Sequence, residues 1–116
     1  MSGRNLRERG VAVVIRHGHV LLVKDRDKHH YSLPGERSFH AAGRELREET
    51  GLIARKIEYI GSFAVAVSFH KAFLIEADDH VHLKKGGELD GYIWWDMKSQ
   101  VPMYQHVKSI LSYLKH

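Results

Sequence analysis

Two nearly continuous apolar runs near the N-terminus constrain the fold of this chain more than any other feature. Residues 11–15 read Val-Ala-Val-Val-Ile, residues 20–23 read Val-Leu-Leu-Val, and His17-Gly18-His19 lies between them. Strongly β-prone runs on both sides of a short glycine turn predict a β-hairpin. Because hardly any polar residue interrupts the runs, we expect both faces of the hairpin to be covered by other parts of the protein.

Two helices and further strands complete the predicted architecture. The first helix is expected over 38–50, with Ser38 as N-cap and Gly51 as the terminating glycine. Helical spacing of apolar residues predicts a second helix over 104–114. Further strands are expected over 56–68, 70–77 and 92–95, with a short strand around Val81 inside a polar loop. This pattern predicts an α+β fold in which a mixed β-sheet is sandwiched between helices.

Length and composition exclude several classes of protein. A chain of 116 residues has room for a single domain, expected to span 1–116. The absence of cysteine excludes disulfide frameworks, thiolate zinc sites and cysteine nucleophiles, and fits a reducing cytoplasm. The charged N-terminus has no apolar core and no apolar run is long enough to span a bilayer, so we expect no signal peptide and no membrane partner.

The net charge of +4 leaves two interpretations open. A basic protein can bind a polyanion, such as nucleic acid or a phosphorylated small molecule. Lys and Arg are spread along the whole chain, however, and this distribution favours an ordinary solvated surface.

The segment over residues 44–52, Arg-Glu-Leu-Arg-Glu-Glu-Thr-Gly-Leu, carries the chemistry. On a helix Glu45, Glu48 and Glu49 share an arc of about 100°, beside the apolar Leu46. Like charges at this spacing repel one another unless a cation lies between them, and Mg²⁺ takes such oxygen ligands. A solvated helix face would explain a Glu-Glu pair, but it does not explain the whole string.

This string resembles the second half of the Nudix box, the sequence signature of the Nudix (MutT-like) hydrolases. The box reads Gly, five residues, Glu, seven residues, then Arg-Glu-apolar-x-Glu-Glu-x-Gly-apolar. Here Glu36 precedes Arg44 by the expected seven residues, and every fixed position from Glu36 to Leu52 is present. The resemblance is specific because many residue types stand at set distances, and it covers nearly the whole chain.

One departure from the box lies between Gly35 and Glu36. His30 stands where the first box glycine is expected, and about six residues of the pattern are absent after Gly35. Either the loop is shortened, or the sequence lacks a segment that the intact protein has. We favour the second, because both flanks match the family closely, and the intact mass of the expressed protein distinguishes the two. A true deletion would turn the chain abruptly into the helix and displace the Gly35 carbonyl.

The resemblance implies hydrolysis of a pyrophosphate linkage in a nucleoside diphosphate derivative or nucleoside triphosphate, with Mg²⁺ or Mn²⁺ as cofactor. By matching positions, Glu48 and Glu49 are metal ligands. Glu45 is either a further ligand or the general base, and Arg44 orients Glu45 or Glu48. Glu36 is expected to have a structural or supporting role.

Outside the helix the resemblance implies further ligands and a nucleotide site. The Gly35 carbonyl often binds metal in the family, and a loop carboxylate is expected from Glu88, with Asp90 as second choice. The aromatic rings of Tyr31, Tyr92 and Trp94 can stack on a base, although core packing is the commoner role for each. The number of metal ions and the identity of the nucleotide stay open.

Other assignments stay beside the leading one. The family makes a homodimer reasonable, and RNA is not excluded as a partner. His80 and His82 share one face of the expected short strand, but without a third ligand they are better explained as surface residues. The chain could instead be a catalytically impaired Nudix-fold module that binds nucleotide or RNA. A basic nucleic-acid-binding domain is a third interpretation, and it leaves residues 44–52 unexplained.

Overall fold

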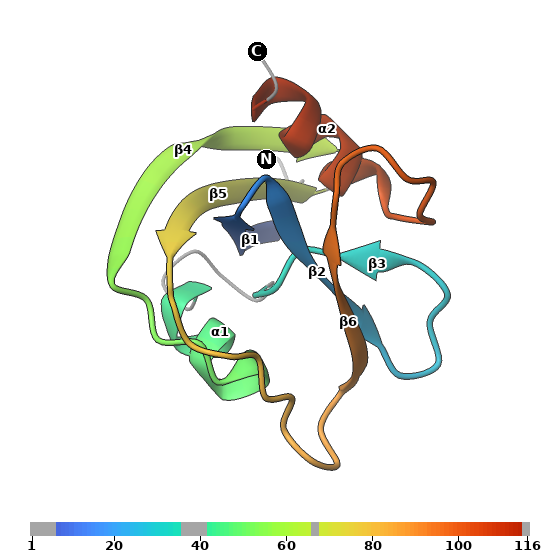
Figure 1. Cartoon of the computed structure of the whole chain (residues 1–116). Helices are drawn as coiled ribbons and strands as arrows, with labels where there is room; N and C mark the ends of the chain where they lie inside the picture. The colour runs from blue at the N-terminus through green and yellow to red at the C-terminus, as the bar shows by residue number, and fades with distance from the viewer. Residues whose placement is uncertain (1–6, 36–41, 66–67, 115–116) are drawn as a thin grey trace.

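A computed structural model describes residues 7–35, 42–65 and 68–114. Figure 1 shows a β-sheet with one helix on each side. In chain order the elements are β1 (Arg7–Arg16), β2 (His19–Asp25), β3 (Tyr31–Ser32), α1 (Ala42–Thr50), β4 (Lys56–Val65), β5 (Ser68–Glu76), β6 (Leu89–Trp95) and α2 (Gln105–Leu114). The predicted mixed sheet between helices is confirmed. Neither helix in these ranges has the length and apolar content needed to cross a membrane.

The hairpin of β1 and β2 joins the two parts of the sheet. Its two-residue turn has positive φ at His17 (50°) and Gly18 (77°), as a type I′ hairpin turn requires. The two strands pair only beside this turn, at Ile15 with Val20 and Arg16 with His19. Further along, the Ala12 amide donates to the Pro34 carbonyl at 2.8 Å. The segment that follows β3 therefore runs beside β1, and the sheet opens where β1 and β2 separate.

Each separated strand carries its own partners. β1 pairs in parallel with β5, which pairs antiparallel with the edge strand β4. β2 pairs antiparallel with β3 on one side and with β6 on the other. The single parallel pairing places distant segments side by side, because β1 and β5 are separated in sequence by three other strands and α1.

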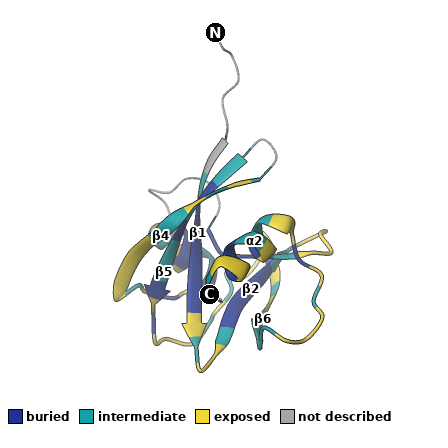
Figure 2. Ribbon diagram, turned by 90° about the horizontal axis from the view of Figure 1, so that it is seen from above, coloured by how far each residue is buried: buried dark blue, intermediate teal, exposed yellow. Residues whose placement is uncertain are grey.

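Both faces of the hairpin are buried, as predicted. Alternate residues of a strand point to opposite faces, and two apolar clusters lie on the two sides of the sheet. On one side Val11, Val13, Val20 and Leu22 pack with Val107, Ile110 and Leu111 of α2. On the other side Ala12, Val14, Leu21 and Val23 pack with Leu46 of α1 and with Leu52. Figure 2 shows β1 and β2 as the buried centre of the fold.

The structure corrects two predictions about elements and adds one element that the sequence did not predict. Residues 77–88 contain no strand, because Val81 and Leu83 pack against the α1-side cluster from a loop that has no ladder partner. β6 begins at Leu89, three residues earlier than expected, and the two-residue β3 was not foreseen. Ser38, Glu36 and the junction after Gly35 lie outside the described residues, so their predicted roles remain predictions.

Candidate active site

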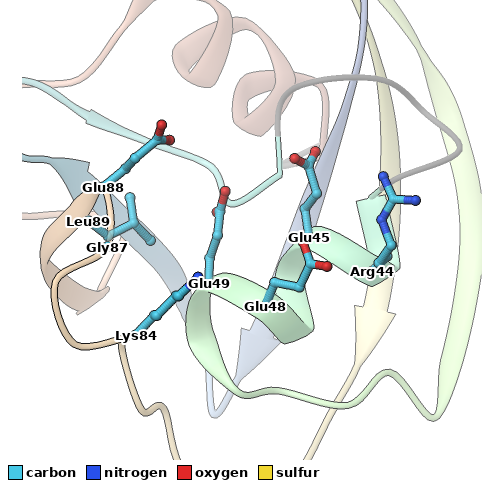
Figure 3. A pocket seen from close by; sticks show the side chains of 8 residues that line it. All are labelled: Arg44, Glu45, Glu48, Glu49, Lys84, Gly87, Glu88 and Leu89. Atoms are coloured by element: carbon cyan, nitrogen blue, oxygen red, sulfur yellow. The ribbon is translucent and has the colours of Figure 1, made fainter.

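Helix α1 directs its three box glutamates into one cavity. The cavity has a volume of about 440 Å³ and is lined by Arg44, Glu45, Glu48, Glu49, Lys84, Gly87, Glu88 and Leu89. Figure 3 shows the four glutamates and the two cations around this space. Glu45 is only 6% exposed, whereas Glu49 is half-buried and Glu48 is exposed. The helical spacing predicted from sequence therefore places these carboxylates together, at different depths.

The end of α1 is held by its own residues and by the loop that follows β5. The Thr50 hydroxyl donates to the Leu46 carbonyl at 2.6 Å, and Leu46 is fully buried. Gly51 has a φ of 79°, and its amide donates to the Arg47 carbonyl at 2.9 Å. The prediction that Gly51 ends the helix is confirmed, because only glycine adopts this conformation without strain.

The fourth glutamate reaches the cavity from the start of β6. The Arg26 amide donates to the Glu88 carbonyl at 2.7 Å, which fixes the backbone of Glu88 next to the end of β2. Asp90, the second choice for a loop carboxylate, forms an ion pair with Lys24 at 2.8 Å and does not line the cavity. Of the two predicted loop acids, the structure thus brings Glu88 to the glutamates of α1.

The donor set in this cavity suits a hard divalent cation. Carboxylate oxygens from α1 and from the start of β6 face one space, and Mg²⁺ or Mn²⁺ prefers such ligands. Within residues 7–35, 42–65 and 68–114, no three acidic or histidine side chains already stand close enough together to hold a metal ion. Glutamate side chains on a common cavity can reach a shared ion by changing rotamer. The residues therefore fit a metal.

Gly35, the other predicted ligand, is buried and has a φ of 75°. It precedes the residues that are not described and does not line the cavity. A carbonyl contact from Gly35 to a metal stays a prediction.

A second cavity of about 380 Å³ lies on the α2 side of the sheet and was not foreseen. Its lining comes from five strands and α2: Arg9, Asp25, Ser32, Leu33, Val65, Ser68, His70, Tyr104, Gln105 and His106. The rings of His70 and His106 stack at 4.1 Å between centroids with 5° between their planes. No sequence pattern marks this site, because single residues from many segments form it.

Asp25 of the second cavity lies near Glu88 of the first. Burial raises the pKa of the Asp25 carboxyl, and repulsion from Glu88 raises it further. Asp25 lines the second cavity and Glu88 lines the first. The two cavities therefore approach each other at the end of β2, where these two carboxylates repel.

The three predicted substrate-binding aromatics line neither cavity. Tyr31 packs against the α2-side cluster, and Tyr92 is 40% exposed on β6. Trp94 packs against the α1-side cluster and lies 5.1 Å below the guanidinium of Arg16. Arg16 in turn donates to the Ala77 carbonyl. The structure thus gives Tyr31 and Trp94 packing contacts, and a role in substrate binding stays a prediction for all three.

The stacked histidines are expected to make folding stability depend on pH. Burial lowers the pKa of His106 from 6.5 to about 4, and the positive charges of His70 and Arg9 act in the same direction. Burial and Arg9 also lower the pKa of His70. Between pH 6.5 and about 4 the unfolded chain therefore binds more protons than the folded protein, so stability falls as the pH is lowered through this range.

We expect the Tm to decrease between pH 7 and pH 4.5, and to decrease less steeply in His106→Asn. The exposed His80→Asn variant serves as the matched control and is expected to follow the wild type. Thermal unfolding monitored by circular dichroism measures this difference. Equal pH dependence in the wild type and His106→Asn would contradict the role of the stacked pair.

Comparison with known proteins places the chain in a family. The sequence model of the NUDIX domain family matches residues 6–111 of this chain. A search of curated proteins finds no match to it. A nudix hydrolase family member from Chromobacterium violaceum is 23% identical, with a TM-score of 0.81 over 96% of this chain and 78% of that one.

Two further solved structures are similar in fold. A MutT NUDIX hydrolase from Burkholderia pseudomallei is 18% identical, with a TM-score of 0.74 over 91% of this chain and 95% of that one. An ADP-ribose pyrophosphatase from Streptococcus suis is 19% identical, with a TM-score of 0.65 over 85% and 80% of the two chains. With the family match over most of its length and the glutamates of the box on one cavity, the chain belongs to the NUDIX domain family of pyrophosphohydrolases.

Proposed function

We propose that this protein hydrolyses a pyrophosphate linkage in a nucleoside diphosphate derivative or a nucleoside triphosphate, with Mg²⁺ or Mn²⁺ as cofactor. The observation that carries the proposal is the convergence of Glu45, Glu48, Glu49 and Glu88 on one cavity, together with Arg44 and Lys84. Phosphoryl transfer depends mainly on positioning and on neutralising charge at the phosphate oxygens. A site with metal ligands and cations on its walls meets both needs.

The residues of the cavity divide the work between metal binding and proton transfer. Glu48 and Glu49 would hold the metal, with Glu88 as a further ligand from the start of β6. A bound divalent cation neutralises charge on the phosphate oxygens and lowers the pKa of the attacking water. Glu45 would act as a third ligand or as the base that receives a proton from water. Arg44 lies one turn before Glu48, where an i, i+4 pair can form, and it would orient Glu48 or Glu45 through a charge-assisted hydrogen bond.

Water and the substrate supply all the atoms of the products, so no further co-reactant is consumed. The water oxygen bonds to one phosphorus atom, the bridging P–O bond breaks, and the second phosphate group leaves with the bonding electron pair. The proton lost by water passes to the base. If Glu45 is the base, the proton passes to its carboxylate, which lines the cavity at a buried position.

We propose that the second cavity receives the nucleoside portion of the substrate. The rings of His70, His106 and Tyr104 lie on its wall and stack on one another, and a free ring face can stack on a base. Glu88 raises the pKa of Asp25, and this supports a position of the second cavity near the carboxylates of the first. Tyr31, Tyr92 and Trp94 remain the alternative set.

The remaining expectations belong to the same proposal. Residues 1–116 would act as one Nudix domain in the cytoplasm, and two copies would form a homodimer. The homodimer is supported by β4, which is an edge strand and carries Ile57 and Tyr59, each 52% exposed. Apolar side chains on an edge strand favour association with another chain.

The function is tested by incubating the protein with a panel of nucleoside triphosphates, ADP-ribose, dinucleoside polyphosphates and capped RNA. We expect release of phosphate or nucleotide from at least one member in Mg²⁺, its loss in excess EDTA, and its return when Mg²⁺ or Mn²⁺ is restored. Saturable ligand binding without turnover, in protein whose mass corresponds to 116 residues, would instead support a binding module. Steeply salt-dependent binding to nucleic acid alone would support the third interpretation.

A further inference from the structure

A lysine lies on the wall of the first cavity, beside the C-terminal end of α1. Lys84 comes from the loop between β5 and β6, and it lines the same space as Arg44 and the four glutamates. Figure 3 shows its side chain extending from below Gly87 toward the carboxylates. This cation belongs to no part of the Nudix box pattern.

The backbone of Lys84 is held directly on the end of α1. The His82 amide donates to the Thr50 carbonyl at 2.7 Å, and the Lys84 amide donates to the Glu49 carbonyl at 3.4 Å. Both acceptors belong to the last turn of the helix, where carbonyls have no partner within the helix. The loop therefore has a defined position relative to the glutamates.

A tight turn after Lys84 fixes the lysine further. The Gly87 amide donates to the Lys84 carbonyl at 3.0 Å, and a Cβ at position 87 would lie 3.2 Å from that oxygen and 3.3 Å from the Lys84 Cβ. Gly87 in turn accepts a hydrogen bond from the Arg26 side chain at 3.1 Å. The loop thus packs closely against the backbone of Lys84, and the Lys84 side chain extends into the cavity.

The charges of the cavity leave Lys84 available for a ligand. Four carboxylates and two cations line the space. Their net formal charge is negative and is one that a single divalent cation would balance. Arg44 belongs to α1 and lies one turn before Glu48, where oppositely charged side chains can pair. Lys84 forms no ion pair within the part of the chain that the structure describes. A pyrophosphate group adds negative charge that Lys84 is placed to meet.

We propose that Lys84 is a phosphate-binding residue, which contacts the pyrophosphate of the substrate from the loop beside the C-terminal end of α1. This inference rests on the proposed function and adds a residue to the same site. A lysine suits this position because its ammonium is a compact charge with three donors on a flexible stem. It can follow the phosphate oxygens as charge builds up on the leaving group.

The test compares three variants at two neighbouring positions. Lys84→Met removes the charge, Lys84→Arg retains it, and Lys85→Met removes the charge of the next residue, which is also exposed but does not line the cavity. Binding of imidodiphosphate, a pyrophosphate analogue that is not hydrolysed, is measured by calorimetry in Mg²⁺. Circular dichroism of each variant checks that it is folded.

We expect Lys84→Met to bind imidodiphosphate about 10- to 100-fold more weakly than the wild type, as loss of a hydrogen bond between charged groups implies. Lys84→Arg is expected to recover most of the affinity, and Lys85→Met to bind like the wild type. Unchanged binding by Lys84→Met, an equal loss in Lys85→Met, or no binding by the wild type would overturn the proposal.

Turnover on the nucleotide panel separates this inference from the proposed function. A protein that hydrolyses a nucleotide but binds imidodiphosphate independently of Lys84 overturns the role of Lys84 alone. A protein that hydrolyses no panel member but binds the analogue through Lys84 retains the phosphate site and loses the proposed function.

Discussion

Replacing Glu48 or Glu49 by glutamine is expected to lower the rate of nucleotide hydrolysis by about a hundredfold or more. Loss of residues that merely support metal ligands costs about 10- to 100-fold, so loss of a ligand itself is expected to cost at least as much. Glutamine keeps the size of the side chain and one carbonyl oxygen, but it removes the charge that attracts the metal. Initial rates on the hydrolysed panel member, measured over a range of Mg²⁺ concentrations, give the effect.

These variants are expected to fold as well as the wild type. Glu49 lies four residues after Glu45, and removing one of two like charges at this spacing relieves a repulsion of a few tenths of a kcal/mol. Glu58→Gln, an exposed substitution on β4, is the matched control and is expected to retain full activity. Full activity in both the Glu48 and the Glu49 variant would overturn the assigned roles.

Replacing Leu46 by alanine is expected to have the largest effect on stability, a loss of about 2–5 kcal/mol. Leu46 is fully buried in the α1-side cluster, where it anchors α1 to the sheet. Truncation removes buried apolar surface and leaves a cavity that the surrounding strands fill only in part. Chemical denaturation in urea measures the change in the free energy of unfolding.

The adjacent Arg47→Ala variant isolates the contribution of burial. Arg47 is exposed, and alanine has an equally good helix propensity, so its stability is expected to stay within about 0.5 kcal/mol of the wild type. A similar loss in both variants would show that α1 is stabilised mainly by local helix formation. Because Leu46 lies between Glu45 and Glu48 in sequence, its loss is also expected to reduce activity at temperatures where the variant is still folded.

The helix and the hairpin could be predicted from sequence because their information is local. Helical spacing alone puts Glu45, Glu48 and Glu49 on one arc and Leu46 beside them, and the structure agrees. The continuous apolar runs of the hairpin likewise predicted that other parts of the protein pack on both of its faces. The glycine at position 51 marked the end of α1 because its role depends on a single backbone angle.

The loop between β5 and β6 could not be predicted in the same way. Val81 and its neighbours were expected to form a strand, but Val81 and Leu83 pack on the core without a ladder partner. Glu88 is the first choice from sequence and Asp90 the second, but only the structure shows that Glu88 lines the cavity while Asp90 pairs with Lys24. The same limit applies to Lys84, because the sequence alone does not distinguish it from Lys85, the exposed lysine that follows it.

The sequence by itself determined the family, the mixed sheet between two helices, and the acidic face of α1, since each depends on periodicity or on residues at set distances along the chain. Only the tertiary structure decided which loop residues join that face, and where the second cavity lies. The parallel pairing of β1 with β5 and the contacts between the loop and the end of α1 bring together residues far apart in sequence. Their proximity follows from packing of the whole chain, and no local pattern records it.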